Sequence, residues 1–394
     1  MNIFNSLGSN YNLQYVVNSI YQDDKNKKKK LIEGLTLAYG GEVELFYKGR
    51  SAITRAIIKS GIAPKSGVAI AGFTCIAVVD AVTKAGMKPV FIDIDETLNF
   101  SAESLEDKIT SNNIKAVIIQ NTLGFPCNIN QIQSVCRKHK LILIEDLAHS
   151  IGCTYDEKNE AGTVGDFVIL SFSQDKVIDA VSGGALITKT KSAISSKPSA
   201  VKNSDASFQD RFYPLFTYGI RKLYKVKLGK LLHAFLKHTH MLSNPMKNDS
   251  FKSLSDWHAG IIISEFLDIE KNVHHRRKIS QIYAKEIKKS MTKPFLISQI
   301  DQAICLRFPI FTDNRDDLTQ FLKNHGVYVS DIWYDSPVSP KKYTDQSGYT
   351  NGLCPQSEII SKKILNLPTH KNVTEEDAKS ISVLINTWHT AQKQ

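Results

Sequence analysis

The chain has 394 residues, of which 42% are hydrophobic and 23% charged, so it can bury a sizeable core and is not globally disordered. Its six cysteines are scattered without a Cys-x-x-Cys pair, which excludes a disulfide framework and a zinc site of the usual spacing. The N-terminus MNIFNSLGSN lacks the features of a secretory signal, and no apolar run approaches the ~18 residues of a membrane span, so we expect a cytoplasmic protein.

The first 40 residues are polar and predict helices, with a lysine-rich run at 25–30 as a solvated face. From about residue 43, short apolar runs alternate with amphipathic stretches, a pattern typical of strands buried on both faces with helices between them. We expect strands at 68–73, 88–94, 114–121, 141–147, 166–172 and 184–188, and helices such as 75–85 and 129–140. This alternation predicts an α/β domain with a mostly parallel sheet, whose ligands lie beyond the carboxyl ends of the strands.

The chain becomes helical from about residue 253. Apolar residues recur at helical spacing over several turns, and Ser255-Asp256 fits the start of this segment as an N-cap. A strand at 303–310, a helix near Asp316 and a last helix from Glu375 follow. We therefore expect two domains: an N-terminal helical segment with a large domain over residues 1–250, and a smaller α+β domain over residues 251–394.

Polar groups that suit a binding site lie at a glycine turn before a predicted helix and after one of the predicted strands. Gly49, Arg50 and Ser51 open a helix whose backbone N–H groups can bind an anion, although a glycine before a helix is usually only a turn. Asp146 and His149 follow a fully apolar strand, where a carboxylate can hold a cationic ring nitrogen. The alternative for this pair is a capping Asp beside an exposed His.

A third strand end carries a lysine. Ser171 ends the predicted strand at 166–172, Lys176 follows shortly after it, and a Gly183-Gly184 turn leads into the next strand. Partial desolvation at such a place lowers the pKa of a lysine and makes it a nucleophile for Schiff-base chemistry. Taken alone, Lys176 is more simply one surface lysine among dozens.

Together these sites resemble the DegT/StrS family of sugar aminotransferases, which are fold-type I pyridoxal-phosphate (PLP) enzymes. The resemblance rests on the glycine turn, EDLAH at 145–149 and SFSQDK at 171–176 with its Gly-Gly pair, and it covers nearly the whole chain. GFTCIAVVDAVTKAGMKPVFIDID (72–95) is similar to the family segment PSFTF…A…AV…AGAKPVFVDID. QNTLGFPCNI, SLSDWHAG and LNLPTHKNVTEED are similar to further family segments. The resemblance implies a central, mostly parallel sheet flanked by helices, a smaller C-terminal α+β domain and a homodimer.

The resemblance also implies roles for single residues. Lys176 would carry pyridoxal 5'-phosphate as a Schiff base and relay the catalytic proton, while Asp146 would keep the pyridine nitrogen protonated. His149 would lie near the ring, and Cys75 falls where many relatives place an aromatic that stacks on it. The cofactor-binding residues implied in this way are Gly49, Arg50, Ser51, Cys75, Asp146, His149, Ser171 and Lys176.

The sequence departs from the family pattern at four places. Arg50 replaces a small hydroxyl residue, Cys75 replaces an aromatic, and Ser182 stands where a Glu commonly precedes the Gly-Gly pair. The family's Asn-Tyr-Arg, which reaches the phosphate across the dimer, is Phe251-Lys252-Ser253 here. None of these departures affects Lys176.

A basic insertion at about 189–250 has no match in the family pattern. Residues 189–252 contain eleven Lys and two Arg against three Asp, so nearly all of the net charge of +11 lies there. No nucleic-acid-binding signature accompanies this charge, so we expect no nucleic-acid partner. Apolar residues from Ile220 to Phe235 recur at helical spacing with lysines on the other face, which predicts an amphipathic helix. We expect it to pack on a partner subunit, with peripheral membrane contact through 215–238 as the alternative.

The function implied by the resemblance is transfer of an amino group from an amino acid, glutamate on family grounds, to a keto-sugar linked to a nucleotide. Such products enter surface polysaccharides or secondary-metabolite sugars. No metal is expected. Two rivals stay open: a PLP-dependent sugar dehydratase, and a non-catalytic regulator or membrane-associated protein on the same fold. Lys176 argues against the dehydratases, in which a His replaces the lysine, and Lys176 with Asp146 argues against a regulator.

Overall fold

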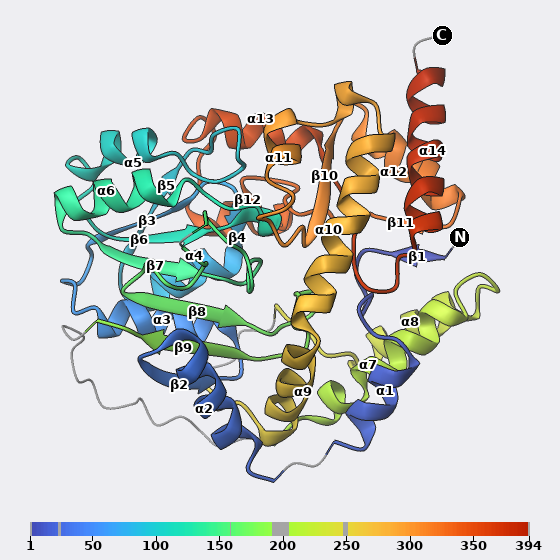
Figure 1. Ribbon diagram of the computed structural model, residues 1–394, viewed down its shortest axis with the longest axis horizontal. Helices are drawn as coiled ribbons and strands as arrows, with labels where there is room; N and C mark the ends of the chain where they lie inside the picture. The colour runs from blue at the N-terminus through green and yellow to red at the C-terminus, as the bar shows by residue number, and fades with distance from the viewer. Residues whose placement is uncertain (1, 23–24, 158, 191–204, 247–250, 393–394) are drawn as a thin grey trace.

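A seven-stranded sheet forms the centre of the larger part of the protein in the computed structural model, which describes residues 2–22, 25–157, 159–190, 205–246 and 251–392 (Figure 1). The strand order is β2-β9-β8-β7-β6-β3-β5. Strands β5, β3, β6, β7 and β8 run parallel, whereas β9 and β2 are antiparallel to their neighbours, so the mostly parallel sheet is confirmed. The strands are β2 (Glu42–Phe46), β3 (Gly67–Ala71), β5 (Lys88–Ile92), β6 (Ile114–Gln120), β7 (Ile142–Asp146), β8 (Phe167–Ser171) and β9 (Gly184–Thr188).

Strand β2 at the edge of the sheet was not among the predicted strands. Its outer residues are glutamates rather than Val or Ile, so the strand lacks the apolar run that marks the others. Glu44 accepts hydrogen bonds from Arg55 and Lys59 of α3 (Gly49–Lys59), at 3.0 and 2.9 Å. These ion pairs hold β2 against the helix that begins at the expected anion site.

Helices cover both faces of the sheet because successive side chains of a strand point to opposite faces. On β3, Val68 and Ile70 pack in one cluster with residues of α3 and α4 (Ile76–Lys84). Ala69 and Ala71 belong to the cluster on the other face, which includes residues of α5 (Ala102–Ile109), α6 (Ile129–His139), α2 (Lys27–Tyr39) and α9 (Asp256–Leu267). The predicted helices at 75–85 and 129–140 correspond to α4 and α6.

The C-terminal part forms a second core around a two-stranded antiparallel pair (Figure 1). The predicted strand at 303–310 begins later, at Arg307, while Ser255 caps α9 as expected and α14 begins at Glu375 with a capping box. The elements are β10 (Arg307–Phe311), β13 (Ile364–Pro368), α10 (Ile269–Glu286), α11 (Pro294–Ser298), α12 (Arg315–Asn324), α13 (Pro355–Lys363) and α14 (Glu375–Ala391). Short 3-10 helices lie at Thr122–Gly124, Lys289–Met291, Lys341–Tyr343 and Asp345–Ser347.

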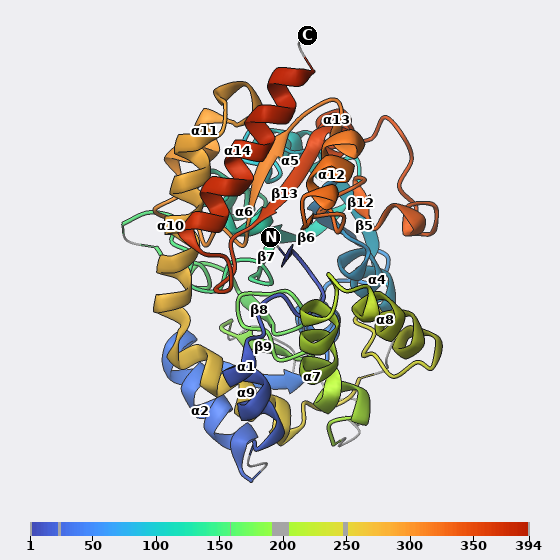
Figure 2. The same cartoon turned by 90° about the vertical axis from the view of Figure 1, so that its right-hand side faces the viewer.

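Two short parallel pairs tie this part to segments far away in the sequence. Strand β1 (Ile3–Phe4) pairs with β11 (Val327–Tyr328), so the first residues join the C-terminal part. The N-terminus lies on the side of the molecule that is on the right in Figure 1 and faces the viewer in Figure 2. Strand β4 (Thr74–Cys75) pairs with β12 (Val338–Ser339). The second pairing brings the chain around residues 330–340 to the carboxyl end of β3.

The predicted amphipathic helix across Ile220 and Phe235 is wrong as a single element. The chain forms α7 (Phe208–Lys222) and α8 (Leu228–His238), and Lys227 has a left-handed φ of 64° between them. Gly229 permits this sharp return, because a Cβ there would overlap the carbonyl oxygen of Ile220. Among the described residues, no helix has the length and apolar character needed to cross a membrane.

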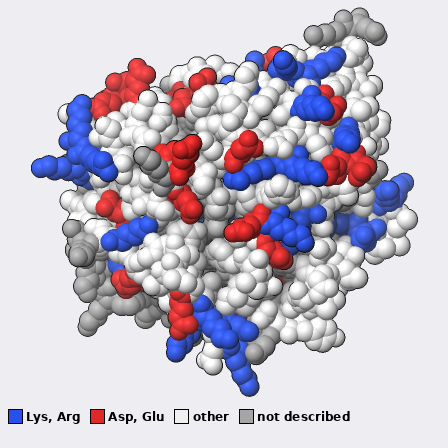
Figure 3. Space-filling view, in the orientation of Figure 1, with Lys and Arg blue, Asp and Glu red and all other residues white. Residues whose placement is uncertain are grey.

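Helix α8 carries a strongly exposed apolar face. Leu228, Leu231 and Phe235 are 56%, 68% and 59% exposed, whereas only Gly229 and Leu236 of this helix are buried. Basic side chains appear in Figure 3 at the right-hand edge, where Figure 1 places the turn between α7 and α8. We therefore expect another surface to pack against this apolar face. The two candidates from the sequence are a second subunit and a membrane, and both stay predictions.

If a second subunit covers this face, Leu231→Asp should lower the association state in analytical ultracentrifugation, because a charge on this face opposes burial. Lys230→Glu is a matched control, since it changes charge on the same helix outside the apolar face. An unchanged association state, together with wild-type protein that sediments with anionic liposomes at low salt, would contradict the subunit contact and favour the membrane.

Glu145 fixes the loop beside the end of β7. Its side chain is fully buried and accepts hydrogen bonds from the backbone N–H groups of Gly162, Val164 and Gly165 and from the Tyr155 hydroxyl, over 2.5–2.9 Å. Four donors converge on one carboxylate, so this acid is structural, while its neighbour at the strand end points to the other face.

Glu145→Gln should lower the free energy of unfolding by about 3 kcal/mol, because an amide N–H₂ replaces one acceptor oxygen and faces buried donors. Urea unfolding monitored by circular dichroism measures this change. The exposed Glu157→Gln serves as the control, with an expected change within about 0.5 kcal/mol. Equal stability of the two variants would show that the loop does not depend on the Glu145 charge.

Candidate active site

One cavity of about 470 Å³ opens at the carboxyl edge of the parallel strands. The chain segments that leave β6, β7 and β8 all contribute to its lining, as does the start of α3. Seven of the eight residues predicted to bind a cofactor line this cavity: Gly49, Arg50, Cys75, Asp146, His149, Ser171 and Lys176. Ser51 is buried but does not line it, and its backbone N–H donates to the Lys48 carbonyl oxygen at 3.1 Å.

Lys176 lies in the turn that follows β8. Asp175, just before it, has a left-handed φ of 63°, and its N–H donates to the Asp179 carboxylate at 2.8 Å, which fixes the turn. The Lys176 Nζ lies 4.4 Å from the centre of the Trp333 ring. Burial lowers the pKa of Lys176 below its usual value. The lysine is thus a half-buried residue whose surroundings shift its amine toward the neutral, nucleophilic form.

Asp146 ends β7 inside the same cavity. Its Oδ1 accepts the Ala148 N–H at 3.0 Å, and the side chain is almost completely buried. Burial raises the pKa of Asp146 to about 6, although the Ala148 hydrogen bond and the Lys176 charge act in the opposite direction. A cation placed beside this carboxylate would stabilise its ionised form, so the site favours a positively charged partner.

His149 is a neutral imidazole with a defined tautomer. Its Nδ1 accepts the Leu123 N–H at 3.1 Å, and burial holds the pKa of His149 well below its usual value. The proton therefore resides on Nε2, which lies 3.4 Å from the Tyr334 hydroxyl. Its ring stacks on Trp333 with centroids 5.1 Å apart, so the alternative of an exposed histidine is wrong.

Another part of the cavity wall lies at the start of α3, where the backbone of Gly49 closely approaches β8 and β9. A Cβ on Gly49 would lie 3.0 Å from the Ser171 Oγ, and a Cβ on Gly184 would lie 2.6 Å from the Gly49 nitrogen. Gly183 has a φ of 145°, which other residues rarely adopt. The Gly183-Gly184 pair therefore allows β9 to pass directly behind this helix start, whose N–H groups and positive dipole suit an anion.

Cys75 has a structural contact in addition to its place in the cavity wall. It caps α4, with its Sγ accepting the Ala77 N–H at 3.5 Å. Burial raises the pKa of the Cys75 thiol, so it is a neutral group rather than a nucleophilic thiolate. Cys75 therefore provides a small, uncharged contact at the place where the family resemblance implies a stacking residue.

Several residues of the site were not found from the sequence. Trp333 lies between the His149 ring and the Arg307 guanidinium, which is 3.9 Å from the centre of the indole. Tyr334 accepts a hydrogen bond from Gln120 at 2.6 Å. Both aromatic residues lie in the chain segment between β11 and β12, and an aromatic residue in a loop carries no sequence signal of what it contacts.

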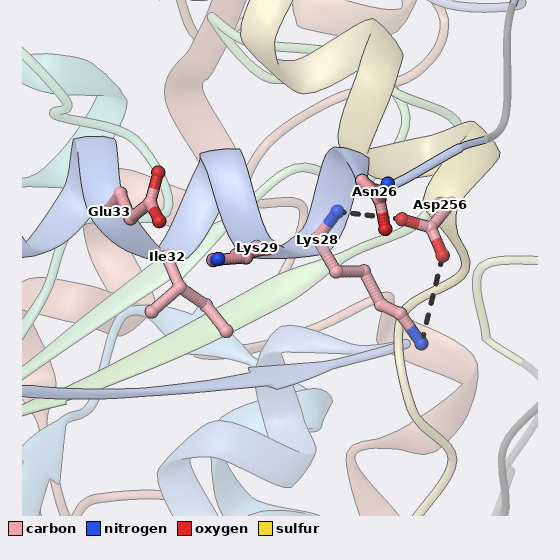
Figure 4. A pocket seen from close by; sticks show the side chains of 6 residues that line it. All are labelled: Asn26, Lys28, Lys29, Ile32, Glu33 and Asp256. Carbon is pink, nitrogen blue, oxygen red and sulfur yellow. Dashed lines mark hydrogen bonds and ion pairs between the residues drawn. The ribbon is translucent and has the colours of Figure 1, made fainter.

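A second hollow on the surface has no comparable chemistry. It lies between α2 and the start of α9 and is lined by Asn26, Lys28, Lys29, Ile32, Glu33 and Asp256 (Figure 4). Asp256 accepts the Lys28 N–H at 2.8 Å, and its other oxygen lies 4.0 Å from the Lys28 Nζ. These contacts join the two helices. Across the described residues, no group of acids, histidines and cysteines could hold a metal ion.

Known proteins resemble this chain over most of its length. The pleiotropic regulatory protein of Geobacillus stearothermophilus is 24% identical over 84% of this chain and 81% of its own. The dTDP-4-amino-4,6-dideoxy-D-glucose transaminase of Shigella dysenteriae is 27% identical over 89% of this chain and 85% of its own. The PLP form of protein Spr1654 from Streptococcus pneumoniae has a similar fold, with a TM-score of 0.73, 18% identity and 96% coverage of both chains.

The family model described as the DegT/DnrJ/EryC1/StrS aminotransferase family matches residues 46–217 and 233–385. The match therefore includes every residue that lines the cavity of about 470 Å³ and is interrupted only over residues 218–232, from the last part of α7 to the early part of α8. The expectation that about 189–250 has no match in the family is therefore wrong outside residues 218–232. This chain belongs to the DegT/DnrJ/EryC1/StrS aminotransferase family.

Proposed function

We propose that this protein is a PLP-dependent aminotransferase that moves an amino group from an amino acid, glutamate on family grounds, to a keto-sugar linked to a nucleotide. One observation carries the proposal: a single cavity joins the Lys176 amine, the buried Asp146 carboxylate and a helix start that suits an anion. PLP has an aldehyde, a basic ring nitrogen and a phosphate, which these three groups match. Surface polysaccharide or secondary-metabolite sugars are the expected products.

The residues present fit this cofactor. A cavity of about 470 Å³ is in the range that holds small ligands. Gly49 and Ser171 form a cradle that a single Cβ would fill, and they would hold the phosphate together with Arg50. Asp146 would hold the ring nitrogen, and Lys176 would attach the aldehyde carbon. When bound, PLP supplies an electron sink for the carbanion that forms as the substrate loses a proton.

The protein's own residues position and move the proton. Burial favours the neutral Lys176 amine, so its Nζ can take a proton from the substrate carbon and return it on the other side of the reaction. Ionised Asp146 stabilises a protonated ring nitrogen. His149 keeps its Nε2–H directed at Tyr334, and the Trp333 ring lies 4.4 Å from the Lys176 Nζ, so it would position this amine.

Two other functions compete with this proposal. A sugar dehydratase would use the same cofactor, but Lys176 argues against it. A non-catalytic regulator is favoured by the similarity to a protein named as a pleiotropic regulator, although a regulator has no need for a desolvated lysine beside a buried carboxylate. We further propose a cytoplasmic homodimer, with the large domain ending near residue 250.

Incubation of the protein with PLP, glutamate and a panel of nucleotide-linked keto-sugars tests the proposal directly. We expect release of 2-oxoglutarate beyond one equivalent per active site only when a suitable keto-sugar is present, because the keto-sugar takes up the amino group and allows further turnovers. Loss of water from the sugar without consumption of glutamate would favour the dehydratase. A protein that binds no PLP would favour the regulator.

Lys176→Ala should abolish turnover and the covalent link to PLP that borohydride reduces, while the protein stays folded. The physical reason is that alanine has neither the attaching amine nor the group that moves the proton. Peptide mass spectrometry after reduction locates the label, and the exposed Lys115→Ala serves as the control. A label on any other lysine would overturn the assignment.

Asp146→Asn should lower kcat by about 10²–10³-fold, because an amide cannot make the charge interaction with the ring nitrogen. Such an interaction contributes about 3–4 kcal/mol between two charges in contact. The effect should fall on kcat more than on donor binding, since the interaction matters most in the transition state. Steady-state kinetics of Asp146→Asn and the wild type decide this, and a near wild-type kcat would show that the ring nitrogen has another partner.

The same substitution should stabilise the protein without cofactor. Because the folded-state pKa of Asp146 is raised to about 6, ionisation of the buried carboxylate lowers stability as pH rises from about 4 to 6. Asp146→Asn should therefore raise the free energy of unfolding by about 2–3 kcal/mol at pH 8, with no difference below about pH 4. Unfolding curves of the cofactor-free proteins measure this, and they also show that lost activity is not lost folding.

A further inference from the structure

Two buried cations stand side by side where the cavity meets the start of α3. The Lys48 and Arg50 side chains flank Gly49 in the sequence, both line the cavity, and the residues are only 4% and 8% exposed. Arg50 also lies 3.3 Å from the Asp80 carboxylate. Lys48 was not predicted to be a site residue, because a lysine before a helix is usually exposed.

Both cations reach the same short segment, residues 243–246, which we call the strap. Lys48 Nζ donates to the carbonyl oxygens of Asn244 and Pro245 at 3.4 and 3.3 Å, and Arg50 donates to Pro245 at 3.3 Å. These are long hydrogen bonds to neutral oxygens. A phosphate offers the same donors shorter, charge-assisted bonds of roughly twice the strength.

The strap follows α8, and hydrogen bonds made by Ser243 hold it in place. Ser243 donates to the Asp210 carboxylate at 2.6 Å, and Gln174 donates to the Ser243 carbonyl at 3.1 Å. Asp210, on α7, also accepts the Tyr47 hydroxyl at 2.7 Å. The helices of the basic insertion are therefore connected to the residue next to Lys48 through buried polar contacts.

The family model matches the chain on both sides of residues 218–232, so the strap at 243–246 lies in a part of the chain that the family model covers. The strap contributes to the cavity wall, since Pro245 and Met246 are lining residues. We propose that Lys48 acts with Arg50 to bind the phosphate of the cofactor, and that the strap closes this end of the site from within the same chain. This inference rests on the proposed function, and it gives the basic insertion a role in retaining the cofactor.

Comparison of PLP with pyridoxal, which lacks the phosphate, tests this role. Lys48→Met should weaken binding of PLP to the cofactor-free protein by about 10- to 100-fold, while binding of pyridoxal changes less than about twofold. Lys48→Arg should restore most of the PLP affinity, because it restores the charge. Lys225→Met, an exposed lysine of the same insertion, is the matched control and should leave both affinities unchanged.

Hydrogen exchange gives a second measurement that does not depend on activity. PLP should protect the strap and α7 in the wild type more than pyridoxal does, and Lys48→Met should remove that difference. Equal weakening of PLP and pyridoxal, or no weakening of either, would overturn the role of Lys48. A wild-type protein that binds neither ligand would instead overturn the proposed function, and unfolding curves would reveal a variant that simply fails to fold.

Discussion

The parallel arrangement of β3, β6, β7 and β8 is the constraint on which the rest of the site depends. Parallel strands end at the same edge of a sheet, so side chains that follow different strands meet there even when they are distant in the sequence. Asp146 and Ser171 occupy two of these ends, and Lys176 follows in the next turn. The glycine pair after Val181 then returns the chain behind α3, which adds the helix start to the same edge.

Burial gives these groups their chemistry. Desolvation disfavours the charged forms of Lys176 and Asp146, so each pKa moves toward the neutral form. The two groups also attract each other, but that attraction is smaller than the cost of burial. A ligand with a cationic nitrogen near Asp146 and an electrophilic carbon near Lys176 relieves both penalties. The free-energy cost of burying these two groups in the ligand-free protein is thus relieved on binding, which contributes to the affinity for such a ligand.

The sequence predicted the sheet and the groups at its strand ends well, because both follow from short-range signals: apolar runs for buried strands, and polar residues directly after them. It failed where long-range contacts decide the structure. Glu42 and Glu44 make β2 look like a loop until their partners on α3 are known. The helix expected through Ile220 and Phe235 broke because Gly229 lets the chain turn back onto α7, a contact that helical periodicity does not contain.

The position of Trp333 in the cavity wall could not be predicted from short-range sequence signals. Its ring contacts both His149, from the turn after β7, and Arg307, from β10 of the C-terminal part. Arg307 is held in turn by the Asp331 carboxylate at 2.8 Å and by the Asn5 carbonyl oxygen. The indole over Lys176 therefore depends on the N-terminal segment, the C-terminal part and the sheet together. A substitution in the N-terminal segment, in the C-terminal part or after β7 would change the position of Trp333. The cavity wall around Trp333 can therefore vary while Lys176 and Asp146 stay in place.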